Sequence, residues 1–334
     1  MNYTVIVALI ASGILGAVCG AVGSFSVLQK RALSSDVFAH SALPGIVIAF
    51  LLLGSKSTPV LLLGALCSGL LGIWVLAKIK SRTKTKDDAS LALVLTTFFG
   101  AGIVLSRHAQ NAVQDGSVAG LDSFLFGKAT GLVMQDLILI TVTAFLIGVI
   151  LIVCFRQLKM TAFDPGYATS VGVPAGWLDR LLLSMTVGAV VAGLPMLGVV
   201  LVAALTIIPA ITARFLTYRL NLMIMLSAGI GGLSAVIGVG LSAVYDGIPT
   251  GPTVILVAGS IFLVTLFFAK DHGIVAKAAQ RRRLQQIAPV IAALRGQPAN
   301  DVARKVMRKL DVGEPGLPNA NGLLLLKQWE EGSV

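Results

Sequence analysis

The sequence predicts an all-α polytopic membrane protein with about nine transmembrane helices and a small helical cytoplasmic tail. Of its 334 residues, 56% are hydrophobic and only 12% are charged, whereas soluble domains carry about 25% charged residues. The apolar runs are continuous and do not alternate with polar residues, which favours helices over a β-barrel. Each run approaches the roughly 20 residues that cross a bilayer as a helix.

Nine apolar segments are expected to be spans, although eight or ten spans would also fit the pattern. The sixth and seventh segments adjoin through Gly193-Leu-Pro195, so one bent element followed by a short helix is an alternative. The expected segments lie at about 5–28, 35–54, 59–79, 89–106, 134–156, 180–195, 197–213, 222–244 and 252–269.

The positions of Lys and Arg predict the orientation of the chain, because cytoplasmic loops are enriched in these residues. With nine spans, the basic loops and the tail all fall on one side, with the N-terminus outside and the C-terminus inside. The net charge of +11 is therefore explained largely by orientation, and no nucleic-acid partner is expected. The expected cytoplasmic charges are Lys30-Arg31, the block 78–86, Arg156, Lys159, Arg214, Arg219 and the tail.

The second span contains two ionisable residues, Asp36 and His40. Residues four apart lie on one face of a helix, one turn from each other. An Asp at membrane depth costs about 2.5–3.5 kcal/mol on insertion scales, so the pair indicates a function. A carboxylate and an imidazole on one face supply half of a site for a divalent transition metal.

The depth of His40 and the following proline strengthen this interpretation. At about 1.5 Å per residue, His40 lies about 14 Å from Arg31 along the helix axis, near the middle of the hydrocarbon core. Pro44 has no N–H, so the carbonyl of His40 loses its helical partner. The alternative is that Asp36 caps the helix and His40 is a satisfied core residue. Two ligands are too few for a tight cage, so a second copy of the span or other ligands would be needed.

The polar connection 158–180 contains a start signal and a stop signal for a short helix. Asp164 is suited to the N-cap and Pro165 to the first helical position. Gly172 then ends the helix about two turns later. A short cytoplasmic helix between two spans can dock onto a soluble partner, although an ordinary loop helix also fits the pattern.

Two further segments have less certain roles. Leu121–Gly127 fits a short interfacial helix and a re-entrant segment equally well. The chain divides into a transmembrane domain, 1–270, and a basic cytoplasmic extension, 271–334. Helical patterns near 284–295 and 299–310 precede a break at Gly313–Pro318 and an apolar helical turn, Leu323–Leu326. A basic module beside a membrane meets anionic lipid or a partner protein more often than DNA.

The sequence lacks the motifs of an enzyme. The stretch Gly54–Thr58 lacks the glycine pattern of a phosphate loop. No His-Glu-x-x-His motif and no Gly-x-Ser-x-Gly motif is present. We therefore expect a transport subunit, with any ATP hydrolysis on a separate chain.

Three stretches resemble the permease subunits of ATP-binding-cassette importers for manganese, zinc and iron. The first runs from Gly23 to Gly45 and includes Asp36 and His40. The second is Leu121–Gly127 followed by Asp136. The third combines Phe163-Asp164-Pro165 and Gly172 with Gly198–Arg214, and Thr250-Gly251-Pro252 fits the start of the last span. The resemblance covers about 5–270.

This resemblance implies a type II, cobalamin-importer-like permease fold in a bacterial plasma (inner) membrane. Two permease copies, identical or paired with a sister subunit, would enclose one pathway. An extracytoplasmic metal-binding protein would deliver the ion, and two ATP-binding subunits would dock from the cytoplasm. The family's coupling helix maps to Asp164, Pro165, Gly166 and Gly172, and its metal positions map to Asp36 and His40.

Under this interpretation no cofactor is bound permanently, and Mn, Zn or Fe is cargo. The alternative is an ion-coupled secondary metal transporter without an ATPase partner. A weaker third hypothesis is a membrane-anchored regulator that acts through its basic tail.

Overall fold

The computed structural model describes residues 3–54, 57–112, 134–245, 248–269, 273, 275, 287–297 and 301–330. The chain forms two units, Met1–Leu263 and Val264–Val334, and the last long helix crosses the boundary between them. The division into domains after residue 270 stays a prediction. The segment Leu121–Gly127, expected to be interfacial or re-entrant, lies outside the described residues.

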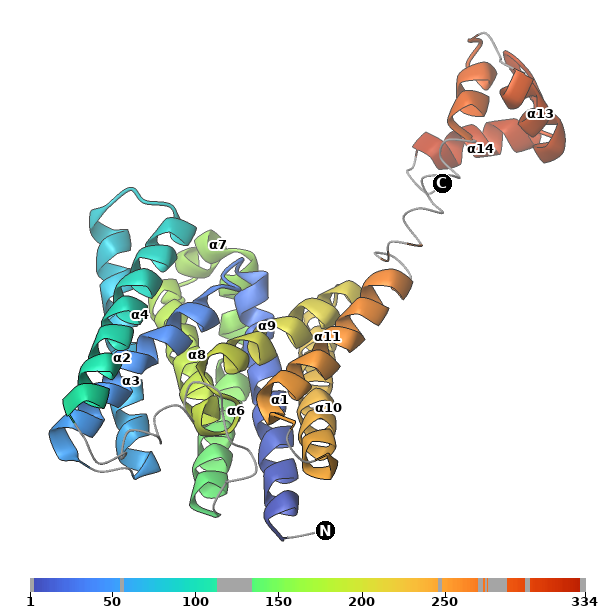
Figure 1. Cartoon of the computed structure of the whole chain (residues 1–334). Helices are drawn as coiled ribbons and strands as arrows, with labels where there is room; N and C mark the ends of the chain where they lie inside the picture. Colours follow the sequence, from blue (N-terminus) through green and yellow to red (C-terminus); the bar gives the residue numbers. More distant parts are fainter. Residues whose placement is uncertain are drawn as a thin grey trace. The chain divides into compact units, whose positions relative to one another are not determined.

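The transmembrane part is built from helices (Figure 1). Within the described ranges, eight helices are long and apolar enough to cross a membrane. The apolar part of α9, Leu201–Leu216, is shorter than these spans. The all-α polytopic architecture is thus confirmed. The helices are α1 (Tyr3–Leu28), α2 (Ser34–Leu53), α3 (Thr58–Arg82), α4 (Asp87–Ala112), α6 (Met134–Phe163), α7 (Pro165–Ser170), α8 (Ala175–Leu197), α9 (Val199–Leu216), α10 (Leu220–Val244) and α11 (Thr250–Phe268).

The boundary between the sixth and seventh expected spans differs from its predicted position. The break falls at Gly198, which has a φ of +81°, and Pro195 lies inside α8. A positive φ favours glycine because it has no Cβ, so Gly198 can separate α8 from α9. Proline near the end of an apolar run was therefore the weaker stop signal.

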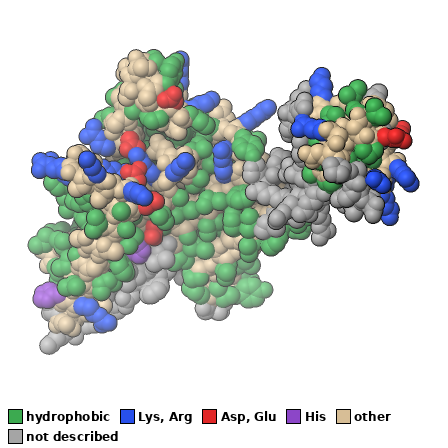
Figure 2. Space-filling view, turned by 90° about the horizontal axis from the view of Figure 1, so that it is seen from above, with side chains coloured by type: hydrophobic (Ala, Val, Ile, Leu, Met, Phe, Trp, Pro, Cys, Tyr) green, Lys and Arg blue, Asp and Glu red, His purple; other side chains and the backbone are tan. Residues whose placement is uncertain are grey.

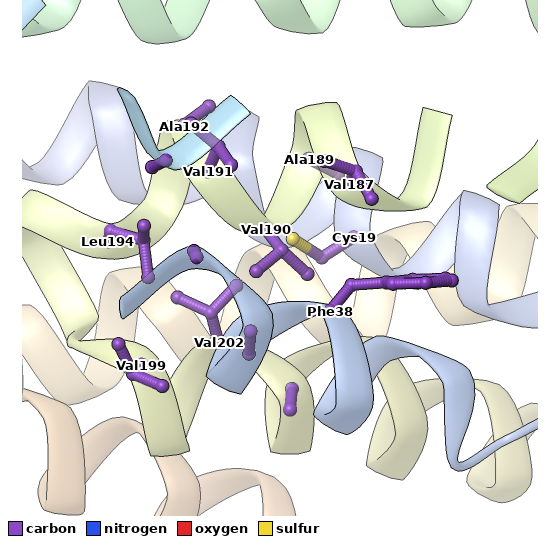
Figure 3. Packing of buried hydrophobic residues seen from close by; sticks show 14 of the residues in the cluster. Cys19, Phe38, Val187, Ala189, Val190, Val191, Ala192, Leu194, Val199 and Val202 are labelled. Atoms are coloured by element: carbon purple, nitrogen blue, oxygen red, sulfur yellow. The ribbon is translucent and has the colours of Figure 1, made fainter. Parts of the chain in front are cut away.

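Helix α1 lies at the centre of the bundle and packs against α6, α8, α9 and α10. Gly16 and Gly20 lie against the backbone of α10 at Gly231 and Ser227, as small residues at this spacing predict. Figure 3 shows part of the core, where the sulfur of Cys19 on α1 lies beside Val190 of α8. The same cluster also contains residues of α2 and α9, among them Phe38, Val199 and Val202.

Helix α2, which carries Asp36 and His40, packs mainly against α3 and α4. Gly45 of α2 and Gly64 of α3 meet backbone to backbone, and a Cβ at either position would collide with the other helix. The hydroxyl of Ser68 on α3 donates to the carbonyl of Ser41, at 2.6 Å. These contacts fix α2 at the level of the ionisable pair.

One end of the bundle carries the loops expected to be cytoplasmic. Arg31 of the α1–α2 connection contacts Asp179 of α8 and Asp87 of α4, so three of these connections meet. Figure 2 looks onto this end, where Lys and Arg side chains gather. The arrangement agrees with the orientation predicted from charge.

The second unit contains helical residues 287–294, α13 (Asp301–Leu310) and α14 (Ala320–Glu330). Its core includes Val290, Leu294, Met307 and Val312. The two helices expected in this region are confirmed. The expected break is a small antiparallel hairpin of β1 (Gly313–Glu314) and β2 (Leu317–Pro318), so the tail is not purely helical.

Candidate functional site

Asp36 and His40 lie on one face of α2, as their spacing predicts. The Nε2 atom of His40 is 3.5 Å from Oδ1 of Asp36. The side chains are 15% exposed for His40 and 38% exposed for Asp36. The pair is therefore open on one side of a single chain, and it is not sealed in the core.

The surroundings of His40 argue against a satisfied core residue. Its Nδ1 atom is buried and has no hydrogen-bond partner among the described residues. Buried polar atoms are paired in the great majority of cases, so Nδ1 differs from the usual histidine of a protein core. The ring of Phe99 on α4 contacts the imidazole edge to face, with centroids 4.7 Å apart. Sequence reasoning missed Phe99, because no local pattern relates it to α2.

The spacing of the two ligand atoms fits a metal ion. Imidazole nitrogen and carboxylate oxygen each lie about 2.1 Å from a bound zinc ion, so two such ligands at a tetrahedral angle are about 3.4 Å apart. The observed separation of 3.5 Å is close to this value. Both atoms can therefore face one ion with only a small side-chain adjustment.

Among the described residues, Asp36 and His40 are not part of a larger group of His, Cys, Asp and Glu side chains. No group of three or more His, Cys, Asp or Glu side chains that could hold a metal ion is found in the described part of the chain. Asp136, part of the mid-chain pattern, is buried at the start of α6. A metal ion bound at this pair would need ligands beyond these two side chains to reach four-coordination.

The predicted short helix is also present. Asp164 caps α7, because its carboxylate accepts a hydrogen bond from the backbone N–H of Tyr167 at 2.8 Å, and Pro165 is the first helical residue. At the other end, the N–H of Val173 donates to the carbonyl of Ala168 and that of Gly172 to Thr169. With Gly172 at a φ of +83°, these bonds form a Schellman motif.

The region around α7 presents large apolar side chains, of which the sequence analysis named only Phe163, as part of a motif. Phe163, Tyr167, Val171 and Trp177 are each more than half exposed. A hollow of about 600 Å³ adjoins α7 and is lined by residues of the α1–α2 connection, Pro165, Gly176 and Asp179. This end of the molecule therefore combines an exposed apolar surface with a recess that Arg31 and Asp179 line in part.

The comparison with known families decides where the chain belongs. The model of the ABC 3 transport family matches residues 1–269. The chain belongs to the ABC 3 transport family. It is a multi-pass bacterial membrane protein of the permease type.

Curated relatives of this family member are named for several metals. The manganese transport system membrane protein MntC of Bacillus subtilis is 44% identical over 273 residues, which are 82% of this chain and 62% of the relative. The zinc transport system membrane protein TroC of Treponema pallidum is 37% identical, over 85% of this chain and 95% of the relative. The chain thus spans less than two thirds of the first relative and nearly all of the second.

Two solved structures resemble the fold. PsaBC from Streptococcus pneumoniae in complex with Fab has a TM-score of 0.71 and 27% identity, covering 84% of this chain and 96% of that chain. An inward-facing conformation of a putative metal-chelate type ABC transporter has a TM-score of 0.55 and 18% identity, covering 79% of this chain. The ABC importer permease fold predicted for the chain is therefore confirmed.

Proposed function

We propose that this chain is the permease subunit of an ATP-binding-cassette importer that moves a divalent transition metal ion, Mn, Zn or Fe, into the cytoplasm. Two permease copies, identical or sister subunits, enclose one pathway. Asp36 and His40 of each copy form a transient ligand ring, and an extracytoplasmic metal-binding protein delivers the ion. The metals named for the relatives support this range of cargo.

The observation that carries the proposal is the pair of ligand atoms on α2. A 3.5 Å separation suits two ligands of one ion, and the pair is partly exposed on one chain. A second copy facing it would bring the number of ligands to four. Few ligands on each subunit favour weak binding, which suits a pathway that the ion must leave.

The surface around α7 supports docking of a cytoplasmic ATPase. Four large apolar side chains are exposed within the short stretch Phe163–Trp177, and aromatic residues are enriched in protein interfaces. We assign Asp164, Pro165, Gly166 and Gly172 to the coupling helix. The cap at Asp164 and the Schellman motif at Gly172 keep this short helix folded, so that it can transmit a force.

The metal site is tested by measuring uptake of Mn²⁺, Zn²⁺ and Fe²⁺ separately in cells that lack other importers. We expect His40→Ala and the isosteric Asp36→Asn to abolish uptake, while the amount of protein in the membrane is unchanged. His108→Ala is the matched control, because His108 is an exposed histidine on α4. Normal uptake by His40→Ala would contradict the site.

The energy source separates an ATP-driven importer from a secondary transporter. Mild detergent extraction of the tagged chain is expected to co-purify an ATPase. Uptake should persist when a protonophore collapses the proton gradient but ATP is maintained. Loss of uptake under these conditions, with no ATPase in the purified complex, would favour the secondary transporter.

A further inference from the structure

A cluster of ionic side chains joins the region of α7 to the helices of the metal site. The guanidinium of Arg31 donates a hydrogen bond to the carboxylate of Asp179, 148 residues away in sequence. Nε of Arg31 also lies 3.8 Å from Asp87, and Lys80 lies 2.9 Å from the same carboxylate. These four residues were expected only to mark membrane orientation or were not singled out.

Backbone hydrogen bonds connect Arg31 to the end of α1 and to the start of α2. Its N–H donates to the carbonyl of Ser26, and its carbonyl accepts from the N–H of Ser34, the first residue of α2, at 3.0 Å. The hydroxyl of Ser34 donates to the same carbonyl at 2.7 Å. A displacement of Arg31 therefore moves the start of the helix that carries Asp36 and His40.

Asp179 is connected to α7 along the chain. The Schellman motif joins α7 to the residues immediately before α8, and Asp179 lies in the second turn of α8. Burial lowers the pKa of Arg31, but the hydrogen bond and charge of Asp179, with the charge of Asp87, outweigh burial and raise that pKa. The guanidinium is thus permanently charged, and its pairing with Asp179 does not depend on its own titration.

Asp87 and Lys80 connect the cluster to α4 and α3, the two helices against which α2 mainly packs. Asp87 is the first residue of α4, and Phe99 on the same helix contacts the ring of His40. Lys80 adds the end of α3, the helix that packs backbone to backbone against α2. The cluster therefore holds the cytoplasmic ends of all three helices around the site.

We propose that Arg31 is a positioning residue that transmits movement of α7 to the metal site, through Asp179 on one side and through α2 and α4 on the other. This inference rests on the proposed import function. When an ATPase moves α7, Asp179 moves with it and shifts the start of α2 through Arg31. The Arg31–Asp87 contact makes α4 follow, so His40 and Phe99 move together.

The test measures coupling and not activity alone. The complete transporter, with its co-purified ATPase and its binding protein, is reconstituted in proteoliposomes, and the number of metal ions imported per ATP hydrolysed is measured. We expect Arg31→Gln and the isosteric Asp179→Asn to lower this ratio about fivefold or more, the lower end of typical coupling effects. Lys84→Gln, an exposed charge in the α3–α4 connection, is the matched control and should keep the ratio.

The conservative variant Asp179→Glu distinguishes loss of the ion pair from general damage, because it keeps the negative charge that faces Arg31. We expect it to keep a substantial part of the ratio that Asp179→Asn loses, and a ratio as low as that of Asp179→Asn would contradict the role of the charge pair. An unchanged ratio in Asp179→Asn would overturn the inference, because that variant keeps the side-chain shape. The proposed function would survive that result if the wild-type complex imports metal, and it would fail if the wild-type complex imports none.

Discussion

Replacing Gly45 by Ala tests how closely α2 must approach α3. A Cβ at this position would lie 2.5 Å from Cβ of Ser68 and 2.7 Å from the carbonyl carbon of Gly64, whereas ordinary contacts begin at 3.4 Å. The two helices must therefore separate locally by at least about 0.9 Å. A functional constellation must be held within about 0.5 Å of its working geometry, so this displacement exceeds the tolerance.

The displacement acts close to His40. The new methyl group presses on Ser68, whose hydroxyl holds the carbonyl of Ser41, the residue next to His40. Overpacking lowers the free energy of unfolding by about 1–3 kcal/mol, whereas the higher helix propensity of Ala raises it by about 1 kcal/mol. We expect a lower thermal unfolding midpoint in detergent and an apparent affinity for the transported metal that falls by about 10–100-fold, as for lost supporting contacts around metal ligands.

The assay compares Gly45→Ala with Gly259→Ala. Nothing lies within 4 Å of a Cβ placed at Gly259, so the control should keep both the unfolding midpoint and metal uptake. If Gly45→Ala matched the control in both measurements, the close approach of α2 and α3 would have no role in positioning the site, and the reasoning would be refuted.

Two further predictions concern the cytoplasmic side. Gly172→Ala places a side chain at a φ of +83° and should destabilise the end of α7 by about 1–2 kcal/mol. We expect the tagged variant to pull down less ATPase than the wild type. An unchanged yield of ATPase would contradict a role of α7 in docking. Met307→Ala removes a core side chain of the tail unit and should lower the free energy of unfolding of that unit by about 2–5 kcal/mol. We therefore expect limited proteolysis to cleave 287–330 faster, while metal uptake stays normal. Loss of uptake would instead give the tail a part in transport.

Local signals in the sequence were sufficient to predict the shared face of Asp36 and His40 and the two ends of α7. The spacing of Asp36 and His40 depends only on helical geometry, and the structure confirms that they share a face. The start and end of α7 follow from Asp164, Pro165 and Gly172 for the same reason, because caps act within one turn. The break at Gly198 was misplaced, since both Pro195 and Gly198 can end a helix and packing decides between them.

The sequence by itself determined the membrane class, the approximate spans and the shared face of Asp36 and His40, because hydropathy and helical period are properties of contiguous residues. Only the tertiary structure decided that Phe99 lies against His40, that Gly45 meets Gly64, and that Arg31 binds Asp179. These contacts join residues on different helices, and their pairing depends on how helix faces pack together.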